Sequence, residues 1–129
     1  MKLFLLILLL PLLSSAEDPH PHAPSGWVEL NSLSPVILTW AYADPAKGLM
    51  DVPSFMVQKY PRSKKFEKFV LEGKPDSSLC RHVLAKHSSE WSQSWCLRKD
   101  SVMVLIWKGE DSLISPHKKG LMNWILTHE

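Results

Sequence analysis

The 129-residue chain has no catalytic signature, only two cysteines and no apolar run long enough to cross a membrane. Such a crossing needs about 18 or more apolar residues, so no membrane span is expected. A Gly-x-Ser-x-Gly elbow is absent, and no histidine pair has the spacing of a zinc protease. Neither asparagine, Asn31 or Asn123, begins an Asn-x-Ser/Thr acceptor, so no N-linked glycan is expected. With no motif that dictates a chemistry, no cofactor, metal site or catalytic residue is predicted.

The first residues have the three parts of a secretory signal peptide. Lys2 supplies a positive charge, Leu3 to Leu13 form an apolar run, and Ser14-Ser15-Ala16 supply small residues before a cleavage site. As a helix, that run would span only about 16 Å, roughly half of the hydrocarbon thickness of a bilayer, which disfavours a membrane anchor. We therefore expect residues 1–16 to be removed and the protein to be secreted into the extracellular space.

The remaining chain is long enough for one domain. Residues 17–26 contain Pro19, Pro21 and Pro24 and predict a flexible Pro/His arm, followed by a single globular domain over residues 27–129. Without Lys2 the chain has 14 basic against 13 acidic residues, so its net charge gives no reason to expect a nucleic-acid partner.

Two sequence signals conflict around the cysteines. Cys80 and Cys96 are expected to form a disulfide, because thiols in an oxidising compartment tend to pair. The apolar spacing from Leu79 to Trp95 predicts a helix, which if continuous would hold the two cysteines about 24 Å apart. A disulfide needs α-carbons within about 7 Å. We expect the disulfide to form and the helix to end near His87.

Other segments show simpler patterns. Alternation of apolar and polar residues predicts strands over residues 27–30 and 65–71, and β-branched or aromatic content predicts strands over residues 36–42 and 55–60, with residues 61–63 as a hairpin turn. Residues 102–107 are apolar at consecutive positions, which predicts a central strand covered on both faces. A last helix is predicted with Ser115 as its N-cap and Pro116 as its first residue.

This order of elements favours an α+β domain, in which a small antiparallel sheet has helices packed on one face. The alternative is an all-β sandwich. The segment Ser32–Trp40 resembles an early strand of fibronectin type III modules, and a strand over residues 57–60 would suit the next one. The resemblance does not extend to the helical pattern of residues 79–95, so the α+β fold is preferred.

A basic segment is the densest candidate binding site. The candidate residues for a heparin-like polyanion are Lys59, Arg62, Lys64, Lys65 and Lys68. On the predicted strand, Arg62, Lys64 and Lys68 share one face and form a short cationic row. The alternatives are an exposed dibasic cleavage site and a solvated edge strand whose lysines discourage aggregation.

Trp91 and Trp95 are the candidate aromatic contacts. Their four-residue spacing places them on one face of the predicted helix. They either pack around the disulfide or form an exposed aromatic pair that anchors a partner.

These observations favour a secreted, non-enzymatic binding or signalling protein whose partner is an extracellular protein or receptor. The alternative is a small secreted hydrolase with ribonuclease-like chemistry, which uses two imidazoles and a cation. The residue types for it are supplied by His82, His87, His117 and His128, with Lys86 or Lys118. Nothing in the sequence brings these side chains together.

Overall fold

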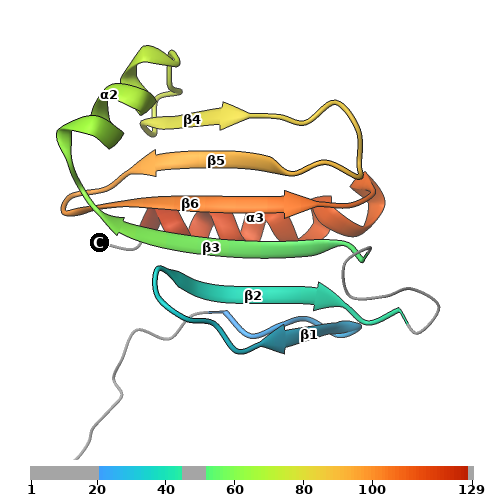
Figure 1. The fold of residues 1–129 in the computed structure, drawn as a ribbon. Coiled ribbons are helices and arrows are strands. Elements are labelled where there is room, and N and C mark those ends of the chain that lie inside the picture. The colour runs from blue at the N-terminus through green and yellow to red at the C-terminus, as the bar shows by residue number, and fades with distance from the viewer. Residues whose placement is uncertain (1–20, 45–51, 128–129) are drawn as a thin grey trace, which may run out of the picture.

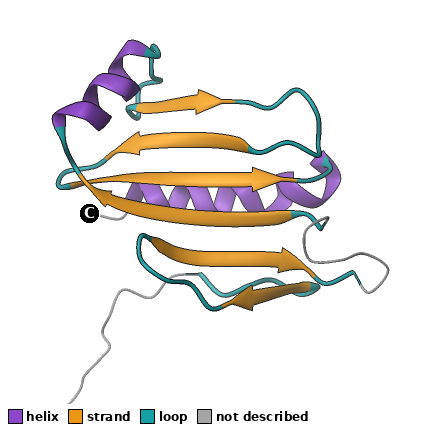
Figure 2. Ribbon diagram, in the orientation of Figure 1, coloured by secondary structure: helices purple, strands orange, loops and turns teal. Residues whose placement is uncertain are grey.

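The computed structural model describes residues 21–44 and 52–127. These residues form six strands and two helices, shown in Figures 1 and 2. In chain order they are β1 (Trp27–Leu30), β2 (Val36–Tyr42), β3 (Ser54–Pro61), α2 (Lys64–Glu72), β4 (Cys80–Val83), β5 (Ser92–Leu97), β6 (Ser101–Lys108) and α3 (Asp111–Thr127).

All six strands belong to one antiparallel sheet with the order β1-β2-β3-β6-β5-β4. The strands predicted over residues 27–30, 36–42, 55–60 and 102–107 are confirmed as β1, β2, β3 and β6. A small α+β fold is thereby supported, whereas the all-β sandwich is wrong because the described strands do not divide into two sheets.

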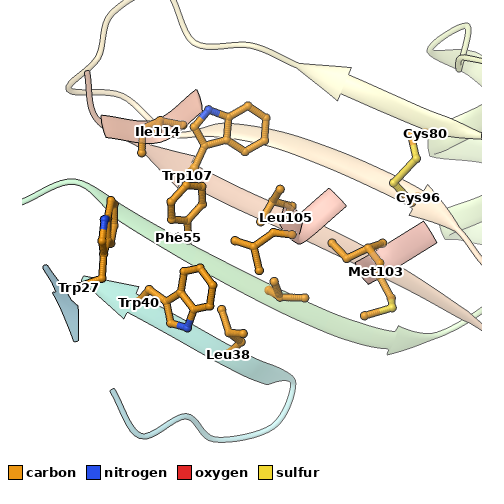
Figure 3. Close-up of a cluster of buried hydrophobic side chains, with 13 residues drawn as sticks. Trp27, Leu38, Trp40, Phe55, Cys80, Cys96, Met103, Leu105, Trp107 and Ile114 are labelled. Atoms are coloured by element: carbon orange, nitrogen blue, oxygen red, sulfur yellow. A yellow bond between two sulfur atoms is a disulfide. The ribbon is translucent and has the colours of Figure 1, made fainter. Parts of the chain in front are cut away.

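One face of the sheet is covered by α3, which lies behind the strands in Figure 1. Ile114, Leu121 and Ile125 of this helix pack in a cluster with buried side chains from β1 to β6. Figure 3 shows part of that cluster, in which Phe55 and Trp107 lie near the middle and the disulfide near one end. This cluster is the main hydrophobic core.

The opposite face is covered at one end by α2. Val70 of this helix packs with Leu97, Val102 and Val104 in a second cluster. In β6, Val104 belongs to this second cluster and the next residue, Leu105, belongs to the main core. Consecutive residues of a strand point to opposite faces. The two helices therefore cover opposite faces, and the expectation that both pack on one face is wrong.

The strand predicted over residues 65–71 is also wrong, because this segment is helix α2. The side chain of Ser63 accepts a hydrogen bond from the backbone N–H of Phe66 and so caps the first turn. Phe66, Phe69 and Val70 are three and four residues apart, so the helix places them together against the second cluster. The basic segment consequently lies on a helix and not on a strand.

The helix predicted over residues 79–95 is replaced by the hairpin of β4 and β5. Cys80 lies directly opposite Cys96 in the register of this hairpin, and the predicted disulfide between them is present. Two antiparallel strands bring residues distant in sequence into direct opposition, which a continuous helix cannot do. The disulfide predicted from the expected oxidising compartment is therefore confirmed, and the helix predicted from the apolar spacing is wrong.

The last helix begins earlier than predicted. The backbone N–H groups of Leu113 and Ile114 both donate to the carbonyl of Glu110, so the first turn forms there. Pro116 lies inside α3, and the hydroxyl of Ser115 donates to the carboxylate of Asp111. Ser115 is therefore not the N-cap.

Several predictions fall partly or wholly outside the described residues: the leader over residues 1–16, the start of the Pro/His arm, and His128. The end of the arm contacts the domain, since Ala23 packs against the main core and the N–H of Trp27 donates to the carbonyl of Pro24. Neither of the described helices has the length and apolarity needed to cross a membrane.

Candidate functional site

Beyond the part covered by α2, the second face of the sheet carries apolar side chains that no described helix covers. We call this surface the open sheet face, and it consists of Val28, Leu30, Met56, Val83, Trp91 and Ile106. Met56 and Ile106 are partly buried, and Ile106 also packs against the second cluster, whereas the other four are exposed. The register places four of these six residues in one row across the sheet, because Val83 lies opposite Gln93, Gln93 opposite Ile106, and Ile106 opposite Met56. The row continues through Thr39 to Leu30.

Trp91 is the most distinctive member of the open sheet face. Its side chain is 41% exposed, and the ammonium of Lys108 lies 4.9 Å from its ring centroid. The loop that carries Trp91 is tied to the end of β6, because the N–H of Gly109 donates to the carbonyl of Ser88. Between this loop and β6 lies a pocket lined in part by Ser88, Lys108 and Glu110. An exposed aromatic ring and a pocket are thus adjacent at one end of the open sheet face.

Trp95, the other candidate aromatic contact, has a different environment. Its ring centroid lies 4.8 Å from that of Phe69 and 5.8 Å from that of Phe66. Its indole N–H donates to the side chain of Gln93. Trp95 is therefore part of the cluster beneath α2, while Trp91 is exposed just before the start of β5.

The five candidate polyanion-binding residues are divided between different environments. Lys59 lies opposite Met103 in the register and belongs to the strand face that α3 covers. Arg62 interacts with other groups of the protein: its Nε lies 2.6 Å from the Glu67 carboxylate, and its Nη1 donates a hydrogen bond to the carbonyl of Arg98. Lys64, Lys65 and Lys68 are exposed on α2. The predicted cationic row along a strand does not exist.

The dibasic pair Lys64-Lys65 lies in the first turn of α2. A protease binds its substrate in an extended conformation, so cleavage there would require this turn to unfold. Because the turn is capped by Ser63, the structure gives the processing interpretation no support.

The described histidines do not converge. His82 lies on the edge strand β4, whereas His117 contacts the ring of Trp27 in β1, the opposite edge strand. Lys118 lies over the ring of Trp107. His82, His117 and Lys118 therefore do not meet around one point.

A hydrogen-bonded chain of Asp76, His82 and Ser94 was not predicted from the sequence. Nδ1 of His82 lies 2.7 Å from the Ser94 hydroxyl, and Nε2 lies 2.8 Å from the Asp76 carboxylate. The hydrogen bond from His82, together with those from the N–H groups of Cys80 and Ser78, lowers the pKa of Asp76. Because Ser94 is only 2% exposed, its hydroxyl cannot meet a substrate as a nucleophile. These hydrogen bonds instead hold the loop before β4 against the β4–β5 hairpin.

No spacing in the sequence indicates this group, because only the pairing of β4 with β5 brings His82 opposite Ser94. Within the described residues, no group of three or more histidine, cysteine, aspartate or glutamate side chains is arranged to hold a metal ion. The chain matches no protein family, no curated protein and no solved structure.

Proposed function

We propose that the protein is a secreted, non-enzymatic binding or signalling protein that contacts an extracellular protein or receptor through the open sheet face. The observation that carries the proposal is that two large apolar side chains are exposed at one end of this face: Trp91, two residues before Gln93, and Val83, which lies opposite Gln93 and is 39% exposed. Contiguous exposed apolar surface is uncommon on monomeric domains, and it typically marks a contact with another molecule.

The composition of this surface favours a protein as the partner. Tryptophan is enriched among the residues that dominate protein–protein binding energy, where it is surrounded by polar groups that exclude water. Near Trp91 the polar side chains are Lys108, whose ammonium lies over its ring, and Gln93, two residues further along, while Thr39 separates Met56 from Leu30 towards the other edge of the sheet. Such a mixture of an apolar centre and polar neighbours is typical of a protein interface.

The disulfide is compatible with an extracellular location, because disulfides persist in oxidising compartments. The proposed secretion also depends on the signal-peptide pattern of residues 1–16. The hydrolase alternative receives no comparable support, since His82 and His117 are associated with opposite edges of the sheet.

The test measures saturable binding of the labelled protein to cultured cells and compares two double variants. Trp91→Ser with Val83→Ser removes the exposed end of the open sheet face. Leu33→Ser with Leu71→Ser is the matched control, because both leucines are exposed and neither belongs to that face. Truncating a central aromatic contact typically costs at least about 2 kcal/mol, so we expect about a 30-fold loss of affinity for the first variant. The control should bind like the unmodified protein.

Prior treatment of the cells with protease identifies the partner class. Binding that disappears after this treatment supports a protein partner. Binding that survives it, or that the Trp91→Ser, Val83→Ser variant retains, would overturn the proposal. Self-association through the same face would also overturn it, and would appear in sedimentation as a dimer that this variant cannot form.

A further inference from the structure

Two basic segments far apart in the sequence meet at one end of the molecule. The backbone N–H of Arg62 donates to the carbonyl of Asp100, and its guanidinium donates to the carbonyl of Arg98. These bonds hold the turn between β5 and β6 against the segment that leads from β3 into α2. In Figure 1 the turn and the start of α2 lie at the same end of the sheet. The turn brings Lys99, which the sequence analysis did not include among the candidate residues, to the side of the basic helix.

The cations at this end differ in how far they are neutralised. The charge of Arg62 is paired with Glu67, and Nη2 of Arg98 donates to the carbonyl of Leu126. Lys68 lies 3.9 Å from Glu72, but both side chains are largely exposed and such a pair is weak. Lys64, Lys65 and Lys99 are exposed and form no ion pair within the described residues.

We propose that Lys64, Lys65 and Lys68 of α2 and Lys99 of the neighbouring turn form one binding site for a sulfated polysaccharide chain. Arg62 acts as the positioning residue, because it holds the turn against the helix while its own charge is paired. This proposal concerns a surface separate from the open sheet face and shares with the proposed function only the extracellular location.

The shape of the site favours a polymeric anion. Lys64 and Lys68 are one helical turn apart, about 6 Å along the axis, so their charges form a spaced series with no enclosed cavity. A small anion gains little from separated, solvated cations, because each contact is screened by salt. A chain with repeated sulfates meets several of them at once and releases the counterions that it had condensed.

The same surface is poorly suited to a single-stranded nucleic acid, which proteins bind with aromatic rings that stack on the bases. The aromatic side chains of α2, Phe66 and Phe69, pack inward against Trp95. An anionic membrane would need an apolar anchor as well as charge. Leu71 is the one large apolar residue of α2 that is more than half exposed, so sulfated polysaccharide is the favoured ligand.

The experiment measures the salt concentration at which the protein elutes from immobilised heparin. Lys64→Gln with Lys65→Gln removes two cations of the helix, and Lys99→Gln alone removes that of the turn. Lys86→Gln with Lys119→Gln is the matched control, since both lysines are exposed and distant from α2 in the fold. Each cation that contacts the polymer should contribute about one unit to the slope of log affinity against log salt. We expect the double variant to lose about two units, Lys99→Gln about one, and the control none.

An unchanged slope for Lys99→Gln would overturn the combined site, because the turn would then take no part in binding. If the control variant lost as much of the slope as the Lys64→Gln, Lys65→Gln variant, binding would depend only on net charge, and this would overturn the proposal as well. Retained binding to desulfated heparin would exclude the sulfates as the recognised groups. Stronger binding to phosphatidylserine vesicles than to heparin would assign the surface to a membrane instead. Unchanged circular dichroism of each variant shows that the fold is intact.

Discussion

Cys80 and Cys96 face each other directly across β4 and β5, so the disulfide joins two neighbouring strands of the sheet. Two residues further along the same strand face, His82 lies opposite Ser94 and is hydrogen-bonded to it. The edge strand β4 contains only four residues. A covalent link and a side-chain hydrogen bond therefore supplement the few backbone bonds that such a short strand can make.

Replacing Cys80 and Cys96 together with alanine should lower the free energy of unfolding by about 3 kcal/mol, the value expected for a closed loop of this length. The physical reason is that the linked unfolded chain has less conformational entropy to lose on folding. Urea denaturation of the two proteins measures the difference. Mass spectrometry of the unreduced protein should show a Cys80 peptide linked to a Cys96 peptide, and two alkylatable thiols would contradict the disulfide.

The second prediction concerns stability at acid pH. The hydrogen bond from His82, with smaller contributions from the N–H groups of Cys80 and Ser78, lowers the pKa of Asp76 in the folded protein. Between the folded and unfolded pKa values the unfolded state binds more protons, so the stabilisation is complete above about pH 3.9 and is lost as the pH falls through the folded pKa. Denaturation of the wild type between pH 2 and 6 should show this loss.

Asp76→Asn keeps an oxygen for the two backbone N–H groups but removes the titration. This variant should show a smaller decrease in stability below pH 4 than the wild type. Asp76→Ala removes every one of these hydrogen bonds and should lower stability by about 1–2 kcal/mol at neutral pH. An identical acid decrease in wild type and Asp76→Asn would exclude Asp76 as its source.

The two tryptophans of the β5 region should respond differently to truncation. Trp95→Ala removes a ring that packs against Phe66 and Phe69, and should cost about 2–4 kcal/mol of stability. Trp91→Ala removes an exposed ring whose described ring contact is with the ammonium of Lys108, and should cost less than about 1 kcal/mol. Thermal or urea unfolding measures both. Similar losses for the two variants would mean that Trp91 is a core residue, contrary to its assignment to the open sheet face.

Two glycines, Gly109 directly after β6 and Gly120 inside α3, provide a pair of substitutions whose expected effects on stability have opposite signs. A Cβ added at Gly120, inside α3, would have no neighbour within 4 Å, so Gly120→Ala should stabilise the helix by about 0.5–1 kcal/mol. Gly109 has a φ of +139°, and a Cβ there would lie 2.6 Å from that of Pro53. Gly109→Ala should therefore destabilise the protein, by about 1–3 kcal/mol. Calorimetry measures the change in unfolding temperature of each variant. A change of the same sign for Gly120→Ala and Gly109→Ala would contradict the environments described for these two glycines.

The local sequence pattern was sufficient to predict those elements whose own residue types favour one secondary structure. Residues 36–42 and 102–107 are rich in β-branched and aromatic side chains, and both are strands. The pairing of Cys80 with Cys96 also followed from the sequence, because only two thiols were available in an expected oxidising compartment.

Short segments of mixed composition could not be assigned in this way. In residues 65–71 Phe66 and Val70 fit a two-residue strand period but Phe69 does not, whereas all three fit a helical spacing, and contact with Trp95 and Val104 stabilises the helix. In residues 79–95 a helical spacing arises by coincidence, since the apolar side chains belong to two strands that face each other. In both segments the decisive interactions are with residues distant along the chain.

The sequence by itself determined the disulfide and the long central strands, because these depend on residue type or on neighbours within a few positions. Only the tertiary structure decided that α2 and α3 lie on opposite faces, that Trp91 is exposed while Trp95 is packed, and that the turn containing Lys99 lies against Arg62, just before α2. The physical reason is that sheet pairing and helix packing depend on contacts between segments distant in sequence. The spacing of apolar residues within one segment does not indicate those contacts.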